Sequence, residues 1–203
     1  MELSQSEAAG GEAPGAEAAP AYTYRPSLLG APFVFRLMAD GVAFQAGRRS
    51  GTVPYRDIRR IRLSFKPASM QSRRYLTEIW ADGAPKLQIV SSTWKSMVEQ
   101  VRQDGDYAAF LVELHRQLAA SGATPVYERG SPPLLYWPGL VLFAAVALSL
   151  AALTVRGLQS GAMAGALFVA AFLALFLWQG GQFFRLNRPG SYRPDDLPRD
   201  LVP

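Results

Sequence analysis

The side chains of this sequence that are best suited to chemistry are basic, and they gather in its middle. Six of them form the candidate binding surface: Arg59, Arg60, Arg62, Lys66, Arg73 and Arg74. In an alternating segment every second residue shares a face, so Arg60, Arg62 and Lys66 line up their charges. Such a surface can attract anionic lipid or an acidic protein. The plain alternative is a solvated sheet face balanced by nearby carboxylates, and a nucleic-acid partner is not expected.

The residue types that catalysis and metal binding need are scarce and scattered. There is no cysteine, and the single histidine, His115, has no partner in the sequence that would position it as a base. Ser91 to Thr93, Asp104 and Asp106 are better explained as helix caps and turn residues. Asp195-Asp196 is a weak metal site in a proline-rich segment. We therefore expect no catalytic residues, no metal and no cofactor.

Two long uncharged runs near the C-terminus must position the rest of the chain. Residues 134–155 and 162–184 are predicted as helices joined by a short loop, 156–161. A helix needs about 20 apolar residues to cross the hydrocarbon core of a bilayer, so the pair predicts a transmembrane hairpin. No acidic or basic side chain lies inside either run, which argues against ion-coupled transport.

Residues at the ends of these runs predict how the hairpin is oriented. Aromatic and basic side chains are typical of a membrane interface, and five are predicted as anchors: Tyr136, Trp137, Trp178, Arg185 and Arg188. The loop of the hairpin carries only Arg156. By the positive-inside rule we expect a two-span protein of a bacterial inner membrane, with both termini and the soluble domain in the cytoplasm.

Small residues recur along the second run. They are Gly161, Gly165, Ala166, Ala170 and Ala174. Small side chains at four-residue spacing let helix backbones approach closely. We favour packing within the hairpin, and the alternative is association with a second copy or with a larger membrane protein.

Residues 22–127 are predicted as one soluble domain. They follow an acidic, Ala/Gly/Pro-rich segment, 1–21, which we expect to be disordered, and they precede a linker, 128–133. From 25 to 126 there are 15 Lys and Arg residues against 8 Asp and Glu residues, a balance of +7. A basic domain beside a bilayer is attracted to anionic headgroups, at about 1 kcal/mol per basic side chain close to the surface.

The first part of this domain has the two-residue period of strands. Alternating residues flank Asp40-Gly41, a strong hairpin signal because glycine readily adopts positive φ. Residues 58–66 are the clearest strand, and further strands are predicted at 74–81 and 86–90.

Helical periods follow the strands. A short helix capped by Ser92 or Thr93 would place Trp94, Met97, Val98 and Val101 on one face. A second helix, Tyr107–Leu118, would be capped by Asp106 and ended by Gly122. The tail, 185–203, is either disordered or fastened through its apolar side chains, Tyr192, Leu197, Leu201 and Val202.

The order of these elements resembles a pleckstrin-homology-like domain. The resemblance is carried by the hairpin Phe33–Phe44, the segment Val53–Ile58 leading into the strand Arg59–Phe65, and the closing helix Tyr107–Leu118. It implies an α+β fold in which a small antiparallel sheet or barrel is closed by an amphipathic helix. With the hairpin, the chain resembles uncharacterised bacterial inner-membrane proteins. One departure is the connection Ala39–Gly41, which lacks the basic headgroup pocket of phosphoinositide-binding members.

These patterns favour a non-catalytic interaction or scaffold module anchored in the membrane. Its expected partners are membrane lipids and either another inner-membrane protein or a second copy of the chain. The first alternative is a sensor that responds to anionic lipid through the basic surface. The second alternative is a membrane enzyme of unknown chemistry.

Overall fold

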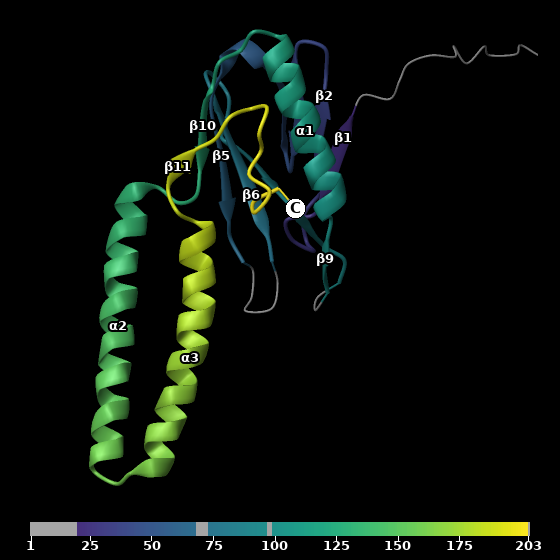
Figure 1. The fold of residues 1–203 in the computed structure, drawn as a ribbon. Coiled ribbons are helices and arrows are strands. Elements are labelled where there is room, and N and C mark those ends of the chain that lie inside the picture. The colour runs from purple at the N-terminus through teal and green to yellow at the C-terminus, as the bar shows by residue number, and fades with distance from the viewer. Residues whose placement is uncertain (1–19, 68–72, 97–98, 203) are drawn as a thin grey trace, which may run out of the picture.

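The computed structural model describes residues 20–67, 73–96 and 99–202 and shows an α+β protein (Figure 1). A β-domain carries a pair of long helices, and its two main sheets have the orders β1-β2-β3-β4 and β11-β10-β5-β6-β7. The strands are β1 (Ala21–Tyr24), β2 (Phe33–Leu37), β3 (Gly41–Ala46), β4 (Arg49–Pro54), β5 (Ile58–Phe65), β6 (Tyr75–Ala81), β7 (Leu87–Val90), β8 (Ser92–Trp94), β9 (Gln100–Arg102), β10 (Val126–Arg129) and β11 (Gly190–Ser191). The helices are a 3-10 turn η1 (Tyr55–Asp57), α1 (Asp104–Ala120), α2 (Pro133–Gln159) and α3 (Met163–Leu186).

The core of the β-domain lies between the two sheets and α1. The alternation predicted for β5 is confirmed, because Ile61, Leu63 and Phe65 are all buried. The apolar stripe of α1 is confirmed as well, and it contributes Tyr107, Phe110, Leu111, Leu114 and Leu118. Period-two and helical patterns were therefore sufficient to find the elements that form the core.

The β-domain has one more N-terminal strand than the sequence predicted. β1 begins at Ala21, which was expected to end the disordered segment, and both of its tyrosines are buried. The hairpin Phe33–Phe44 therefore joins the second and third strands, not the first two. The first connection is residues 25–32, so the departure seen at Ala39–Gly41 concerned a different loop.

The turn at Asp40-Gly41 is present, but for a different physical reason. The Met38 N–H donates to the Gly41 carbonyl at 2.8 Å, which closes the turn between β2 and β3. Gly41 is not among the glycines with positive φ. Instead, a Cβ at this position would collide with the Val53 carbonyl of β4. The glycine is needed for close approach between strands, not for left-handed backbone.

The predicted linker 128–133 was wrong in part, because its first residues continue a strand. β10 pairs in parallel with β5, with Val126 opposite Arg60 and Arg129 opposite Leu63. β11, from the tail, then pairs with β10. Four residues without a clear alternation give no local strand signal, and the pairing depends on the distant β5.

The short helix predicted after Ser92 was also wrong, because β8 and β9 form a hairpin there. Its strands are held by the end of β1: the Arg25 N–H donates to Thr93 Oγ1 at 2.9 Å, and the Trp94 N–H donates to the Arg25 carbonyl at 3.2 Å. These tertiary bonds override a weak local helical period. Two residues of that predicted helix, Met97 and Val98, lie outside the described residues.

Helix α1 begins two residues before the predicted cap, Asp106. The residue before the helix is Gln103, which makes no side-chain capping bond, and Asp106 lies within the first turn. Acidic residues are favourable there because the helix dipole is positive at that end. Gly122 has a φ of 71°, so the predicted stop is confirmed.

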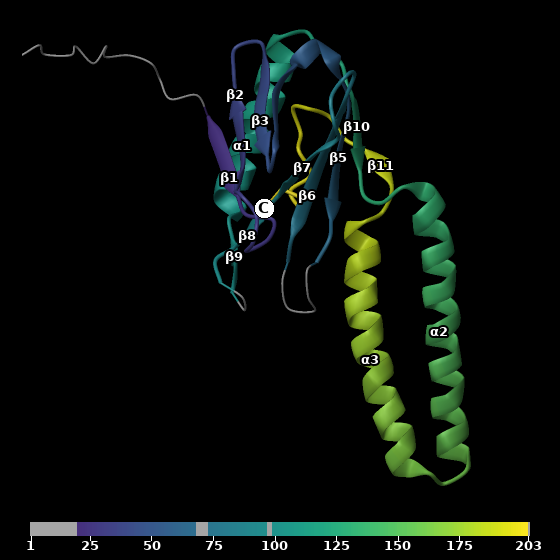
Figure 2. The ribbon, with the colours of Figure 1, turned by 180° about the vertical axis from the view of Figure 1, so that it is seen from behind.

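The two predicted long helices are present and extend side by side from the β-domain (Figures 1 and 2). Both are long and apolar enough to cross a membrane. α2 is longer than residues 134–155 and includes Arg156, so the connecting loop is 160–162 and not 156–161. After α3 the chain turns back onto the β-domain, where Leu201 is buried, so the tail is ordered and fastened (Figure 1).

Candidate functional site

The six basic residues do not form one surface, because they divide between the two ends of β5. Arg59, Arg60 and Arg62 lie near the start of the strand, and we call this the paired end. Lys66, Arg73 and Arg74 lie beyond its finish, and we call this the open end. Arg60 and Lys66 are six residues apart, about 20 Å at the rise of an extended strand.

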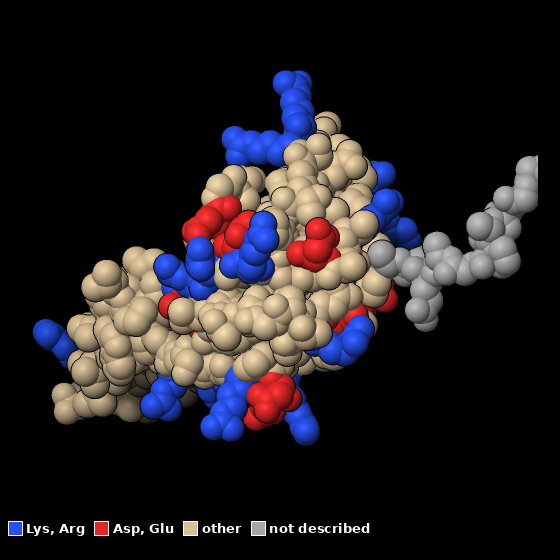
Figure 3. Space-filling model, turned by 90° about the horizontal axis from the view of Figure 1, so that it is seen from above, with Lys and Arg blue, Asp and Glu red and all other residues tan. Residues whose placement is uncertain are grey.

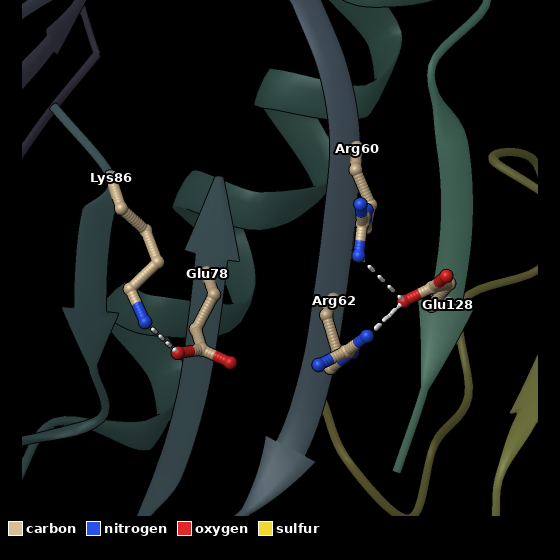
Figure 4. A network of polar contacts seen from close by, with 5 residues as sticks. All are labelled: Arg60, Arg62, Glu78, Lys86 and Glu128. Carbon is tan, nitrogen blue, oxygen red and sulfur yellow. Dashed lines mark hydrogen bonds and ion pairs between the residues drawn. The ribbon is translucent and has the colours of Figure 1, made fainter. Parts of the chain in front are cut away.

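Carboxylates neutralise the paired end. The Arg62 guanidinium donates to Glu128 from Nε at 2.9 Å and from Nη2 at 2.5 Å, while Arg60 lies 4.0 Å from the same carboxylate (Figure 4). Arg59 donates to Asp82 at 2.7 Å. Figure 3, which looks down on the molecule from above, shows basic and acidic side chains interspersed over this face of the molecule, without a large patch of one sign.

Trp80 lies under the cations of the paired end. Its ring centroid is 5.0 Å from the Arg60 guanidinium carbon, 5.2 Å from that of Arg62 and 5.5 Å from the Lys86 amino group. Cations over an indole face are attracted to its negative π surface. The arrangement holds three long side chains around one half-buried aromatic ring.

Glu78 completes this network on the neighbouring strand and is 6% exposed. Burial raises the pKa of its carboxyl group, but hydrogen bonds from Lys86 at 2.8 Å and Gln88 at 3.2 Å outweigh burial, and the net pKa is lowered. Glu78 is therefore ionised at neutral pH and holds Lys86 in place (Figure 4). These groups form a structural ion network, not an acid–base pair.

The open end has a different electrostatic surrounding. Arg74 donates from Nε to the Lys66 carbonyl at 2.9 Å. Both side chains line a cavity of about 370 Å³ that also includes Arg25, Trp94 and Gln100. Among the described residues that line it there are three cations and no carboxylate. Arg25 was missed because the sequence placed no strand at 21–24, and recognising the alternation of Tyr22 and Tyr24 would have revealed it.

The predicted stripe of small residues lies only in part at the contact between the two helices. Added Cβ atoms at Gly161 and Gly165 would meet no neighbour within 4 Å, and Gly161 lies in the loop with a φ of 77°. Ala166 is buried against Gly157, Ala170 is half-buried, and Ala174 is exposed.

Close approach at the other end of the hairpin depends on a glycine outside that stripe. The ring of Phe143 from α2 occupies the place where Gly180 would carry a side chain. Close approach of α2 and α3 therefore involves Gly157, which meets Ala166 of the stripe, and Gly180, which meets Phe143.

The predicted interface anchors lie near the end of the hairpin that carries the β-domain. Tyr136 is buried and donates to the Phe184 carbonyl at 3.3 Å, which joins the start of α2 to the end of α3. Trp137 is 59% exposed and Trp178 is 70% exposed. Arg185 and Arg188 are exposed beside them.

The polar residues considered for catalysis are not brought together. Ser91 is buried and accepts a hydrogen bond from the Tyr75 N–H at 3.0 Å. Asp104 forms an ion pair with Arg102, and Asp195-Asp196 lies in the tail. In the part of the chain that the structure describes, no three side chains of the metal-binding types converge.

His115 has a structural environment in α1. Its Nδ1 donates to the Leu111 carbonyl at 2.7 Å, so its Nε2 accepts from the Tyr192 hydroxyl at 2.9 Å. Burial lowers the pKa of the imidazole to about 4, so the ring is neutral at physiological pH. Its role is to hold the C-terminal segment against α1.

A junction that the sequence did not reveal fixes the long helices to the β-domain. Asn187, directly after α3, is fully buried; its Oδ1 accepts from the Phe65 N–H at 3.1 Å and its Nδ2 donates to the Phe65 carbonyl at 2.8 Å. The Gly130 N–H, just before α2, donates to the Leu63 carbonyl at 2.7 Å. The chain is thus hydrogen-bonded to β5 both where it enters and where it leaves the hairpin.

The C-terminal segment adds a second attachment. Arg129 forms an ion pair with Asp200 at 2.5 Å, and Leu201 is 1% exposed.

No family model, curated protein or solved structure matches this chain. The resemblance to pleckstrin-homology-like domains therefore stays a prediction, based on the hairpin Phe33–Phe44, the segment Val53–Phe65 and the closing helix Tyr107–Leu118.

Proposed function

We propose that this protein is a non-catalytic, membrane-anchored interaction module of the bacterial inner membrane. In this proposal α2 and α3 cross the bilayer, and the β-domain, of pleckstrin-homology-like type, meets another inner-membrane protein or a second copy. The observation that carries it is the double junction at Phe65 and Leu63, because a module that is merely tethered needs no buried clamp between anchor and domain.

The surfaces of α2 and α3 support membrane insertion. Most of the large apolar side chains that the described chain exposes belong to these two helices, including Leu148, Phe168 and Trp178. Water would penalise such a continuous apolar surface, whereas lipid tails would not. The basic residues flanking the hairpin at the β-domain end support a cytoplasmic position for that domain.

The paired end is the candidate surface for a protein partner. Tryptophan and arginine are the residues most often found at the energetic centres of protein interfaces. Trp80, Arg60 and Arg62 lie together there, and their side chains are held by Glu128 and by ring contacts. Pre-organised side chains lose less conformational freedom on binding than free ones.

Photo-crosslinking in native membranes tests this proposal. A photoreactive amino acid replaces Trp80 in one variant and Val112, which is 55% exposed on α1, in a matched control. We expect a discrete crosslinked product from position 80 and a much weaker one from position 112. Equal yields from both positions, or no product from either, would contradict a specific partner surface at the paired end.

The anionic-lipid sensor is the second candidate function, and the cavity at the open end favours it. Three cations without a lining carboxylate are suited to a phosphate group. The two candidates use opposite ends of β5, so one protein can have both. No observation favours the enzyme alternative.

A further inference from the structure

Two hollows lie at the open end of β5, and they differ in chemistry. The first is the basic cavity lined by Lys66, Arg74 and Arg25. The second is an apolar groove of about 410 Å³ between Pro67 and α3. Its α3 side is formed by Phe172, Leu175, Phe176, Gln179, Gly180 and Phe183. Lys66 lines the cavity and the next residue, Pro67, lines the groove, so the chain that leaves β5 contributes to both hollows.

The groove lies well below the end of α3. Phe176 is ten residues before Leu186, which corresponds to about 15 Å along a helix. In both views β5 and β6 run toward the β-domain end of α3, with their open end pointing the same way as the helical hairpin (Figures 1 and 2). The buried Asn187 bonds keep β5 in that position.

A bilayer placed on the hairpin brings this groove to lipid. A hydrocarbon core of about 30 Å spans about 20 helical residues, and 20 residues counted from Met163 end at Gln182. Phe172 to Gln179 then lie at the depth of acyl chains, and Pro67, the residue after Lys66, lines the groove with them. This placement depends on the membrane insertion proposed above.

We propose that the open end binds one anionic glycerophospholipid as a specific ligand. Its phosphate lies between the Lys66 ammonium and the Arg74 guanidinium, and one acyl chain lies in the groove along α3. Arg25, which also lines the cavity, supplies a third positive charge. The site thus combines a headgroup pocket from the β-domain with a chain groove from the helix.

The chemistry of the two hollows selects this ligand class. Guanidinium and ammonium groups are the usual protein donors to phosphate oxygens. An acidic peptide would satisfy the cations but would leave the apolar groove on α3 without a partner. A zwitterionic lipid would fill the groove but would add a positive headgroup charge to a cavity that already has three.

Native mass spectrometry of the full-length protein in detergent tests the site. The probes are phosphatidylglycerol, phosphatidylcholine with the same chains, and glycerol phosphate without chains. We expect one phosphatidylglycerol retained at least 10-fold more tightly than phosphatidylcholine, and weak or no retention of glycerol phosphate. The double variant K66Q/R74Q should lose about 30-fold in affinity, because each cation near an anionic surface contributes about 1 kcal/mol.

Matched variants separate this site from general attraction. R56Q/R59Q removes the same charge from Arg59 of the paired end and from Arg56 in η1, directly before β5, and should leave binding unchanged. Leu175→Trp fills the groove and should weaken binding, whereas Leu177→Trp, two residues away and outside the groove, should not. Equal loss from both charge variants would overturn the proposal, and so would tight glycerol phosphate binding that Leu175→Trp does not affect.

Failure of this site is distinguishable from failure of the proposed function. Retention of the wild-type protein in membranes during alkaline carbonate extraction tests insertion by itself. If the protein stays in the membrane but does not prefer phosphatidylglycerol, the lipid site is wrong and the anchor stands. If carbonate releases the protein, the anchor is wrong, and the lipid site fails with it.

Discussion

The two ends of β5 carry similar basic side chains in opposite surroundings. At the paired end, Arg59 and Arg62 donate to Asp82 and Glu128, and Trp80 lies beneath the cations. At the open end, Lys66 and Arg74 line a cavity without a lining carboxylate in the described chain, next to an apolar groove. The same alternation of arginine and lysine along one strand therefore produces two surfaces, and neighbouring strands decide which cations remain available to a ligand.

The largest change in the free energy of unfolding is expected when the Asn187 junction is broken, because this junction fixes β5, and with it the paired end and the open end, relative to α3. We predict that Asn187→Ala lowers the free energy of unfolding by about 3 kcal/mol, because two buried backbone groups of Phe65 lose their partner. Chemical unfolding in detergent micelles measures the change. The neighbouring exposed Arg188→Ala is the control and should change it by less than about 0.5 kcal/mol. Equal effects would show that the junction is not a clamp.

We predict that acid destabilises the protein through His115, which holds the C-terminal segment against α1 and lies at neither end of β5. The pKa of His115 is about 4 in the folded protein, below its ordinary 6.5, so the unfolded chain takes up the proton first. The free energy of unfolding should therefore fall by about 3 kcal/mol between pH 6.5 and pH 4, and level off below. Unfolding curves of wild type and His115→Gln across this range check it. A pH dependence that the variant retains in full would contradict this assignment.

Removing one charge should lower the free energy of unfolding more at the paired end than at the open end. Glu128→Gln should destabilise the β-domain by about 1 kcal/mol, because Arg62 is only 12% exposed and loses its charged partner. Thermal unfolding at low and high salt measures the effect. An unfolding temperature equal to that of the wild type would mean that the network of Figure 4 contributes no stability.

The smallest change in the free energy of unfolding is expected at the open end. Lys66→Gln should change the free energy of unfolding by less than about 0.5 kcal/mol, because the exposed side chain has no carboxylate partner among the residues that line its cavity. Its consequence should instead be weaker retention of phosphatidylglycerol by the full-length protein, with a reduced salt dependence. Native mass spectrometry in detergent at two ionic strengths measures this. A destabilisation as large as that of Glu128→Gln would remove the contrast between the two ends.

Local pattern was sufficient wherever burial follows a regular period. The strand with Ile61 and Leu63, the stripe of α1 and the two long apolar helices were all predictable, because each buries or exposes one face repeatedly. β10 was not predictable, since its four residues become a strand only by pairing with β5. The β8–β9 hairpin was mistaken for a helix, because bonds from Arg25 decide its structure.

The candidate sites show the same limit. The sequence identified six basic residues but could not separate them, since Asp82, Glu128 and Trp80 reach the paired end from other strands. Arg25 joins the open end from residues 25–32, a loop that exists only because β1 exists. Charge composition therefore predicted that a basic surface exists, and tertiary structure determined which part of it is available.

Depth measurement in proteoliposomes tests the central claim, that the open end meets the lipid and the paired end does not. The chain has no cysteine, so single substitutions Pro67→Cys, at the open end, and Arg56→Cys, in η1 directly before the paired end, can each carry one fluorescent label. Spin labels attached to phospholipids at known depths then quench each fluorophore. The account predicts strong quenching of the label at position 67 by spin labels near the headgroups and upper acyl chains, and weak quenching at position 56. Equal quenching at both positions, or stronger quenching at position 56, would contradict it.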